Sequence, residues 1–239
     1  MVESIVTAAL VIIGDEILSG RTADKNINFL AKNLTELGIV LREVRVVADI
    51  EEDIIFAVNQ LRKKYNYIFT SGGIGPTHDD ITAEAIAKTF NQKLIKNPTA
   101  EKILHDYYKD NVNAARMKMA ILPEFATLLD NPVSSAPGFK IENVFVMAGV
   151  PEIFAAMFFC AQKELTFGSK IMSQEVKTHL TESIIAQDFA NLQKKYPMVT
   201  MGSYPSKEGT ALVFRSSDEE NLNQAKQEMQ KILEQKHHL

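Results

Sequence analysis

The sequence predicts an α/β fold: a doubly wound, mostly parallel sheet followed by a small α+β module. Strand-like apolar runs alternate with helix-like segments in the first part of the chain, which is the pattern of a sheet with helices on both faces. The first run, residues 5–13, is almost continuously apolar, as in a parallel strand buried on both sides. After Gly168 the pattern changes to a strand hairpin flanked by helices, which predicts the separate module.

The elements of the sheet domain are expected in a regular order. Residues 5–13 end at Gly14, and the segment DKNINFLAKNLTELG then has apolar residues at helical spacing, with Asp24 as a cap and Gly38 as the stop. The strand IVLREVRVV, the helix EEDIIFAVNQLRKKY and the short strand YIFT follow. After them come the helical segment AIAKTF, a helix at about residues 98–110, a wrapped loop with short strands in ILPEFATLLDNPVSSAPGF, the strand NVFVM and the amphipathic helix PEIFAAMFFCAQKEL.

The module after Gly168 contains the strand EVKTHL, the helix ESIIAQDFANLQKKY, the strands MVTMGSY and TALVFRS, and a final helix from Asp218. A Lys-Glu-Gly turn joins the last two strands as a hairpin. We therefore expect a nucleotide-binding domain at residues 1–168 and a small α+β domain at residues 169–239. Because the module lacks an aromatic-rich basic surface, we expect it to pack against the first domain or a second subunit rather than bind RNA.

The composition favours a globular protein and excludes several classes. The 239 residues are 46% hydrophobic and 23% charged, and a net charge of -4 gives no general basic footprint for nucleic acid. The single cysteine, Cys160, excludes an intrachain disulfide framework and a cysteine-rich zinc site, and we expect it to fill the core. The run IVTAALVII is shorter than the ~20 residues of a membrane span and lacks the flanks of a signal peptide, so we expect a cytoplasmic protein without a membrane partner.

The strand order predicts where a ligand binds, because doubly wound sheets bind ligands at the carboxyl ends of their strands. Three loops follow such strand ends: residues 14–26, the glycine loop TSGGIGPTHDDIT at residues 70–82, and AGVP at residues 148–151. The glycine loop matches neither G-x-G-x-x-G nor a Walker motif, so a dehydrogenase or a Walker-type ATPase is not supported. The glycine loop still joins a strand to a helix N-terminus, an arrangement that favours binding of an anion such as phosphate. The alternative interpretation of the loop is a tight turn followed by a capped helix.

The aspartates of the glycine loop have two interpretations. Thr77 and Asp80 match a capping box, in which case Asp80 only satisfies the first N–H groups of the next helix. The cap leaves Asp79 unexplained, and two carboxylates beside a bound phosphate are unfavourable without a cation. A magnesium-like ion resolves the conflict, since it takes one or two carboxylates together with phosphate oxygens and waters. We therefore expect Asp79 and Asp80 to bind a metal.

Other polar residues at these loops have structural alternatives that the sequence leaves open. These are a solvated turn for Asp15 and Glu16, an N-cap for Asp49, a solvated loop residue for His78, and turn residues for Asn26 and Asn131.

Four motifs, in this order along the chain, resemble the molybdopterin-binding-like domain of the competence/damage-inducible protein A family. They are IGDEILSGRTADKN, TSGGIGPTHDDITAEAIAKTF, ILPEFATLLDNPVSSAPGF and AGVPEIFAAMF. The same domain occurs at the N-terminus of eukaryotic FAD synthases. GGIGPTHDD together with ARMKMAILP and THLTES is more similar to the FAD-synthase branch. The resemblance extends from about residue 8 to the end of the final helix.

The resemblance implies a metal-dependent hydrolase that splits the pyrophosphate bond of a dinucleotide such as FAD or ADP-ribose and releases AMP. It implies Mg, Mn or Co as the metal and a homodimer as the assembly. The alternative is a non-catalytic protein that binds molybdopterin or a nucleotide. By motif match, the catalytic residues are Asp80, Asp49 and Glu16. The ligand-binding residues are Gly14, Asn26, Gly72, Gly73, Gly75, Thr77, Asn131, Gly149 and Pro151.

The sequence also departs from the family pattern. Ala148 stands where the family usually carries proline, and Ser71 replaces the common threonine or histidine. Neither change removes a charged group from the expected site. We find neither the amidohydrolase domain of the bacterial family nor the adenylyl-transferring domain of FAD synthase in these 239 residues, so we expect this chain not to make FAD.

Overall fold

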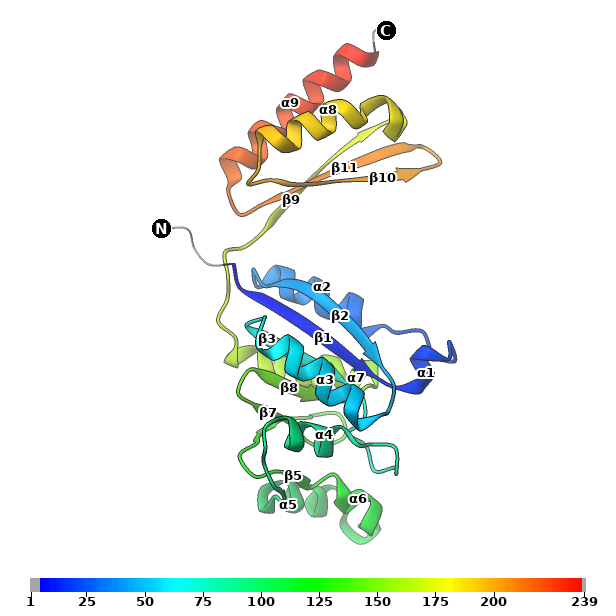
Figure 1. The fold of residues 1–239 in the computed structure, drawn as a ribbon, viewed down its shortest axis with the longest axis vertical. Coiled ribbons are helices and arrows are strands. Elements are labelled where there is room, and N and C mark those ends of the chain that lie inside the picture. The colour runs from blue at the N-terminus through cyan, green and yellow to red at the C-terminus, as the bar shows by residue number, and fades with distance from the viewer. Residues whose placement is uncertain (1–4, 238–239) are drawn as a thin grey trace. The chain divides into compact units, whose positions relative to one another are not determined.

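The computed structural model describes residues 5–237, with side chains for residues 5–236. The chain divides into two compact units, Met1–Gly168 and Ser169–Leu239 (Figure 1). The first unit contains all three loops that the strand order singled out, so the candidate site lies within one unit.

A six-stranded sheet in the order β2-β1-β3-β8-β7-β6 forms the centre of the first unit. Its strands are β1 (Thr7–Ile13), β2 (Val40–Val47), β3 (Tyr67–Ser71), β6 (Thr127–Leu129), β7 (Gly138–Ile141) and β8 (Val144–Met147). β2, β1, β3 and β8 are parallel, and β7 runs antiparallel to both of its neighbours. The predicted doubly wound, mostly parallel sheet is therefore confirmed. The chain passes from β1 to β2 on one side and then to β3 on the other, so the switch point lies between β1 and β3.

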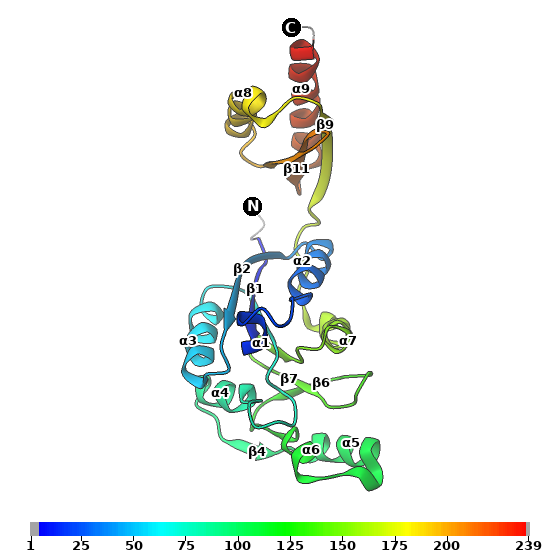
Figure 2. The ribbon, with the colours of Figure 1, turned by 90° about the vertical axis from the view of Figure 1, so that its right-hand side faces the viewer.

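Four helices cover the two faces of this sheet (Figure 2). α2 (Asn26–Glu36) and α7 (Pro151–Ala161) lie on one face, and α3 (Glu51–Arg62) and α4 (Thr82–Thr89) lie on the other. The α7 side has an aromatic core, in which the rings of Phe69 and Phe145 stack with centroids 5.3 Å apart. Cys160 of α7 is only partly buried, so the expectation of a core cysteine is met in part.

The predicted ends of α2 are confirmed by its hydrogen bonds. The Asp24 carboxylate accepts the N–H of Ile27 at 2.8 Å, and Gly38 follows the helix with φ +70°. A side-chain acceptor at the N-terminus and a left-handed glycine after the C-terminus each satisfy groups that the helix leaves unpaired.

The remaining segments of the first unit extend it beyond the main sheet. They are α1 (Asp15–Leu18), β4 (Leu94–Lys96), α5 (Pro98–Tyr108), the 3-10 turn η1 (Lys109–Asn111), α6 (Ala114–Lys118), β5 (Ile121–Pro123) and the 3-10 turn η2 (Gln162–Glu164). β4 and β5 pair with each other in a separate two-stranded sheet. The helix expected at about 98–110 ends at Tyr108. The short helix α6 was not predicted, because its single turn begins only through the Asn113 cap, which accepts the N–H of Arg116 at 2.9 Å.

The second unit is a three-stranded antiparallel sheet, in the order β10-β11-β9, with two helices. Its elements are β9 (Met172–Thr178), α8 (Glu182–Lys195), β10 (Thr200–Ser206), β11 (Gly209–Ser216) and α9 (Glu219–His237). The predicted hairpin and flanking helices are confirmed, although β9 begins three residues before the expected strand. Alternate residues of β11 are buried, so the helices cover one face. Among the described residues, no helix has the length and apolar character needed to cross a membrane.

Candidate functional site

A pocket of about 540 Å³ opens at the carboxyl ends of β1, β3 and β8, which is a volume suited to a small-molecule ligand. It lies at the switch point of the sheet, where the first loop, the glycine loop and the loop after β8 meet. Most of the predicted site residues line it: Gly14, Glu16, Asp49, Gly72, Gly73, Gly75, Asp79, Asp80, Asn131, Gly149 and Pro151. Asn26 and Thr77 do not.

The backbone of the glycine loop is held against the start of α4. Gly72 and Gly73 have φ angles of +113° and +67°, a region that glycine adopts without strain. The Thr82 hydroxyl donates to the carbonyl of Gly72 at 3.0 Å, and the Thr82 N–H donates to the carbonyl of Gly73 at 3.0 Å. Within the part of the chain that the structure describes, no hydrogen bond uses the N–H groups of Gly73, Ile74 or Gly75. These donors at the pocket are suited to an anion.

Two carboxylates lie directly over glycines at the pocket. A Cβ atom on Gly75 would lie 2.6 Å from Asp80 Oδ2, and a Cβ atom on Gly14 would collide with the carboxylate of Glu16. Any larger residue at Gly14 or Gly75 would displace these acidic side chains. Gly149 also approaches Gly72 closely, with its Cβ position 3.3 Å from the Gly72 Cα atom. The glycines therefore make room for carboxylates and for a neighbouring loop, besides exposing backbone N–H groups.

Residues 77–80 form a closed turn, which we call the acidic turn. The N–H and the hydroxyl of Thr77 both donate to Asp80 Oδ2, the former at 2.8 Å. The capping-box alternative is wrong, because α4 begins only at Thr82 and Asp80 closes a turn upstream of the helix. His78 of this turn is almost fully exposed and lies outside the pocket wall, in line with a solvated loop residue.

Asp49 joins the end of β2 to the first loop. Its Oδ2 atom accepts the N–H of Asp15 at 2.9 Å, whereas α3 begins at Glu51 without a side-chain cap. The N-cap alternative for Asp49 is therefore wrong. Burial raises the pKa of the Asp49 carboxyl, the hydrogen bond from Asp15 opposes this, and the negative charges of Asp15, Glu16 and Asp79 raise the pKa further. The pocket mouth is thus a region of negative potential.

This raised pKa leads to a stability prediction for Asp49→Asn. An Asp whose pKa is higher in the folded state than in the unfolded state binds protons more tightly when folded, so its ionisation destabilises the fold at pH values above the folded pKa. Asn keeps an oxygen for the Asp15 N–H and removes the charge. We expect the variant to melt at a higher temperature than the parent at pH 7, and the difference to shrink as the pH falls through the pKa of Asp49. An equal or lower melting temperature at pH 7 would contradict the prediction; thermal unfolding at several pH values measures it.

Asn26 and Asn131 organise the loops around the pocket. The Asn26 side chain is 3% exposed, and its Nδ2 atom donates to Ser71 Oγ and to the carbonyl of Gly149, both at 2.8 Å. It therefore ties together α2, the end of β3 and the loop after β8. Asn131 Oδ1 accepts the N–H of Val133 at 3.1 Å, which confirms the turn interpretation, and the residue also lines the pocket.

Some residues that line the pocket were not predicted from the sequence. Tyr108, at the end of α5, lines it, and the Arg116 guanidinium lies 4.3 Å from the centroid of the tyrosine ring. Thr22 and Ser134 also line the pocket. Tyr108 was missed because α5 does not follow a strand of the main sheet, and the rule of carboxyl strand ends therefore does not point to it.

A metal ion fits this site only if the protein supplies some of its ligands and a bound small molecule and water supply the others. Among the described residues, no three His, Cys, Asp or Glu side chains converge as a cation site. The pocket nevertheless has the oxygen donors that Mg²⁺ and Mn²⁺ prefer, in Glu16, Asp49, Asp79 and Asp80. The donor set therefore fits a cation that takes one or two carboxylates and completes its shell with oxygens of a bound ligand and waters.

A mostly parallel doubly wound sheet, with unpaired glycine-loop amides and carboxylates at its switch point, defines the class of α/β proteins whose ligand site lies at the carboxyl ends of the strands. Comparison with known families agrees with this class. The chain belongs to the family described as "Probable molybdopterin binding domain", whose model matches residues 9–163. Residues 170–238 match the family described as "FAD synthase, middle domain".

Individual relatives are similar to this chain over most of its length. A protein of Archaeoglobus fulgidus is 31% identical over 227 residues, covering 95% of this chain and 98% of that one. A putative competence-damage inducible protein of Clostridium beijerinckii is 32% identical over 216 residues, covering 86% of this chain and 53% of that one. The crystal structure of a CinA protein of unknown function from Thermoplasma acidophilum matches with a TM-score of 0.64 and 32% identity, covering 67% of this chain and 99% of that chain. The resemblance to the competence/damage-inducible protein A family is confirmed.

Proposed function

We propose that this chain is a metal-dependent nucleotide pyrophosphatase that splits a dinucleotide such as FAD or ADP-ribose into AMP and a second phosphate ester. One observation carries the proposal: unpaired amides of the glycine loop and four carboxylates line a single pocket of about 540 Å³. The amides suit the oxygens of a diphosphate, and the carboxylates suit the water and cation that its hydrolysis requires. The match of residues 170–238 to a domain of FAD synthase also supports a nucleotide ligand.

The pocket has room for the two ends of such a substrate. The N–H groups of Gly73, Ile74 and Gly75 would hold the diphosphate. The ring of Tyr108, backed by Arg116, together with the apolar side chains of Ile153 and Met157, would contact a flavin or adenine ring. This division accounts for the presence of both charged and apolar residues in the lining of the same pocket.

In the proposed reaction, water adds to one phosphorus, the bridging P–O bond breaks, and a carboxylate of the pocket accepts the proton. Asp49 suits the proton acceptor because its pKa is raised. Asp80, fixed by two hydrogen bonds from Thr77, suits the orientation of the water. A divalent cation held by Asp79 and Asp80 would neutralise the diphosphate and favour ionisation of the water.

A second candidate function is binding without hydrolysis, with molybdopterin or a nucleotide as the ligand. The family match to a molybdopterin-binding domain favours it, and one fold can serve either use. The carboxylates around the glycine-loop amides would repel the phosphate of a bound ligand. Binding of such a ligand would therefore also need a cation, whether or not hydrolysis follows.

A panel of dinucleotides separates the two functions. The chain is incubated with FAD, ADP-ribose or related dinucleotides in the presence of Mg²⁺, Mn²⁺ or Co²⁺, and AMP is measured by chromatography. We expect AMP from at least one substrate, with none after chelation of the metal. Protection of the protein against thermal unfolding by a pterin or nucleotide, with no AMP from any substrate, would contradict the hydrolase and favour the binder.

We also propose that the protein acts in the cytoplasm as a homodimer, without a nucleic-acid partner. The net charge of -4 supports the expectation that nucleic acid is not a partner. Light scattering at micromolar concentration measures the assembly, and a mass of one chain would contradict the dimer.

A further inference from the structure

The acidic turn is held from outside by a lysine that lies far along the chain. Lys118, the last residue of α6, donates from Nζ to the carbonyl oxygens of Thr77 at 2.9 Å and of Asp80 at 2.8 Å. Thr77 and Asp80 are also the two ends of the turn that the Asp80 carboxylate closes. One ammonium group therefore holds both ends of the turn that presents Asp80 at the pocket.

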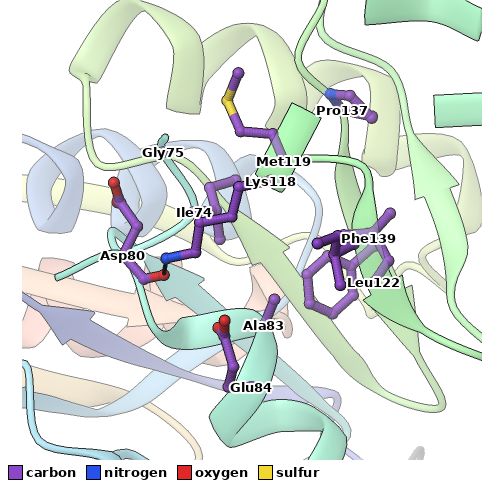
Figure 3. A pocket seen from close by; sticks show the side chains of 12 residues that line it. Ile74, Gly75, Asp80, Ala83, Glu84, Lys118, Met119, Leu122, Pro137 and Phe139 are labelled. Carbon is purple, nitrogen blue, oxygen red and sulfur yellow. Dashed lines mark hydrogen bonds between the residues drawn. The ribbon is translucent and has the colours of Figure 1, made fainter. Parts of the chain in front are cut away.

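Lys118 and Asp80 both line a small cavity (Figure 3). Its volume is about 20 Å³, which is room for about one water molecule. Gly75, Asp80, Glu84 and Lys118 line it, together with apolar residues such as Leu122 and Phe139. Figure 3 shows the side chain of Lys118 reaching the backbone of Asp80, with Glu84 of α4 at the same cavity. Lys118 is partly buried at this cavity, with its ammonium group on the two carbonyls.

Charge reinforces this arrangement. Among the described residues, Glu84 Oε2 is a buried side-chain oxygen without a hydrogen-bond partner. Lys118 lines the same cavity, so a positively charged side chain lies near that buried oxygen, and burying an oxygen without a partner is costly. The backbone carbonyls, which carry partial negative charge, gain a charge-assisted hydrogen bond that is stronger than a neutral one.

We propose that Lys118 is the positioning residue of the acidic turn and holds Asp80 in the geometry that the site uses on a diphosphate. The inference rests on the proposed hydrolase function. Lys118 lines the small cavity and not the ligand pocket, so it acts through the turn rather than on the substrate. It also makes α6 a part of the site, since the neighbouring Arg116 of the same helix backs Tyr108 in the pocket wall.

The test compares Lys118→Met with Lys102→Met. Methionine keeps an unbranched apolar stem and removes the donor, and Lys102 is an exposed lysine of α5 outside both cavities. We expect Lys118→Met to lower kcat by about 10- to 100-fold with a much smaller change in KM, since a small misplacement of a catalytic group costs about this much. We also expect amide hydrogen exchange over residues 74–82 to accelerate at least about tenfold. Lys118→Arg, which retains charged donors, should recover part of both losses.

The measured outcomes distinguish a positioning role from a general loss of folding. Two results for Lys118→Met would overturn the proposal. One is unchanged amide exchange over residues 74–82, and the other is faster exchange there together with a kcat equal to that of the Lys102→Met control. A loss of activity caused by unfolding would appear as faster exchange across β1 and β3 as well, and would also overturn it. If the parent protein releases no AMP from any dinucleotide, the proposed function fails separately. The Kd for ADP in the presence of Mg²⁺ then replaces kcat: an increase of about tenfold supports the positioning role, and no change overturns it.

Discussion

Asp80→Asn is expected to lower turnover by about 10²–10³-fold while the protein stays folded. Removal of one preorganised electrostatic group commonly costs this much in rate. The asparagine oxygen can still accept the Thr77 N–H, so the acidic turn keeps one of its closing hydrogen bonds. Replacement of a charged acceptor by a neutral one should cost about 1 kcal/mol, or roughly 2–4 °C in melting temperature. The measurements are steady-state AMP release and thermal unfolding of the same preparation.

A matched control uses Asp106→Asn, which changes an exposed carboxylate of α5 outside the pocket. This variant should have the turnover of the parent. We further expect Asp80→Asn to need a higher metal concentration for half-maximal rate, because it loses a candidate ligand. Parental turnover in Asp80→Asn would show that Asp80 only closes the turn.

Gly73→Ala is expected to cause the largest loss of stability among these changes. Gly73 has a φ of +67°, which costs about 1–2 kcal/mol for a residue with a Cβ atom. The added methyl group would also collide with Thr82 Oγ1, whose hydrogen bond to Gly72 is buried, and loss of such a bond costs about 1–3 kcal/mol. Together these terms predict a melting temperature lower by about 10 °C and loss of nucleotide binding. Thermal unfolding with and without ligand measures both effects.

Gly20→Ala is the control for backbone strain. Gly20 has a similar φ of +72°, but a Cβ atom there would have no neighbour within 4 Å. Its cost should be limited to about 1–2 kcal/mol. The double variant Gly73→Ala with Thr82→Ala removes the colliding oxygen and should be less destabilised than the sum of the two single variants. Equal losses for Gly73→Ala and Gly20→Ala would refute the collision as the cause.

Sequence periodicity was sufficient for the fold because buried parallel strands and one-sided helices leave strong patterns. The run that became β1 and the apolar spacing of α2 are of this kind. Short elements were harder. α6 has one turn, and the pairing of β4 with β5 joins segments of three residues each, so their formation depends on tertiary contacts that no local pattern contains.

The location of the pocket followed from strand order, but the contacts within the candidate site did not. The Thr77–Asp80 spacing fits a capping box, yet hydrogen bonds from Thr82 to Gly72 and Gly73 move the start of α4 downstream. The position of Asp49 before α3 also fits an N-cap, yet its carboxylate accepts the N–H of Asp15 in the loop that follows β1. Tyr108 and Lys118 enter from α5 and α6, which lie away from the carboxyl strand ends. These contacts depend on which backbone groups meet in space, and sequence spacing does not specify that.

The late position of β8 in the chain has a consequence for the order of folding. β3 pairs with β1 on one edge and with β8 on the other, and Ile68 is matched with Val144. A chain leaving the ribosome can therefore form β1, β2 and β3 while one edge of β3 still lacks its partner. That apolar edge is a template for wrong pairing until β8 arrives. Gly149 and its contact with Asn26 come later still, so the pocket is assembled last and a ligand can stabilise only the completed unit.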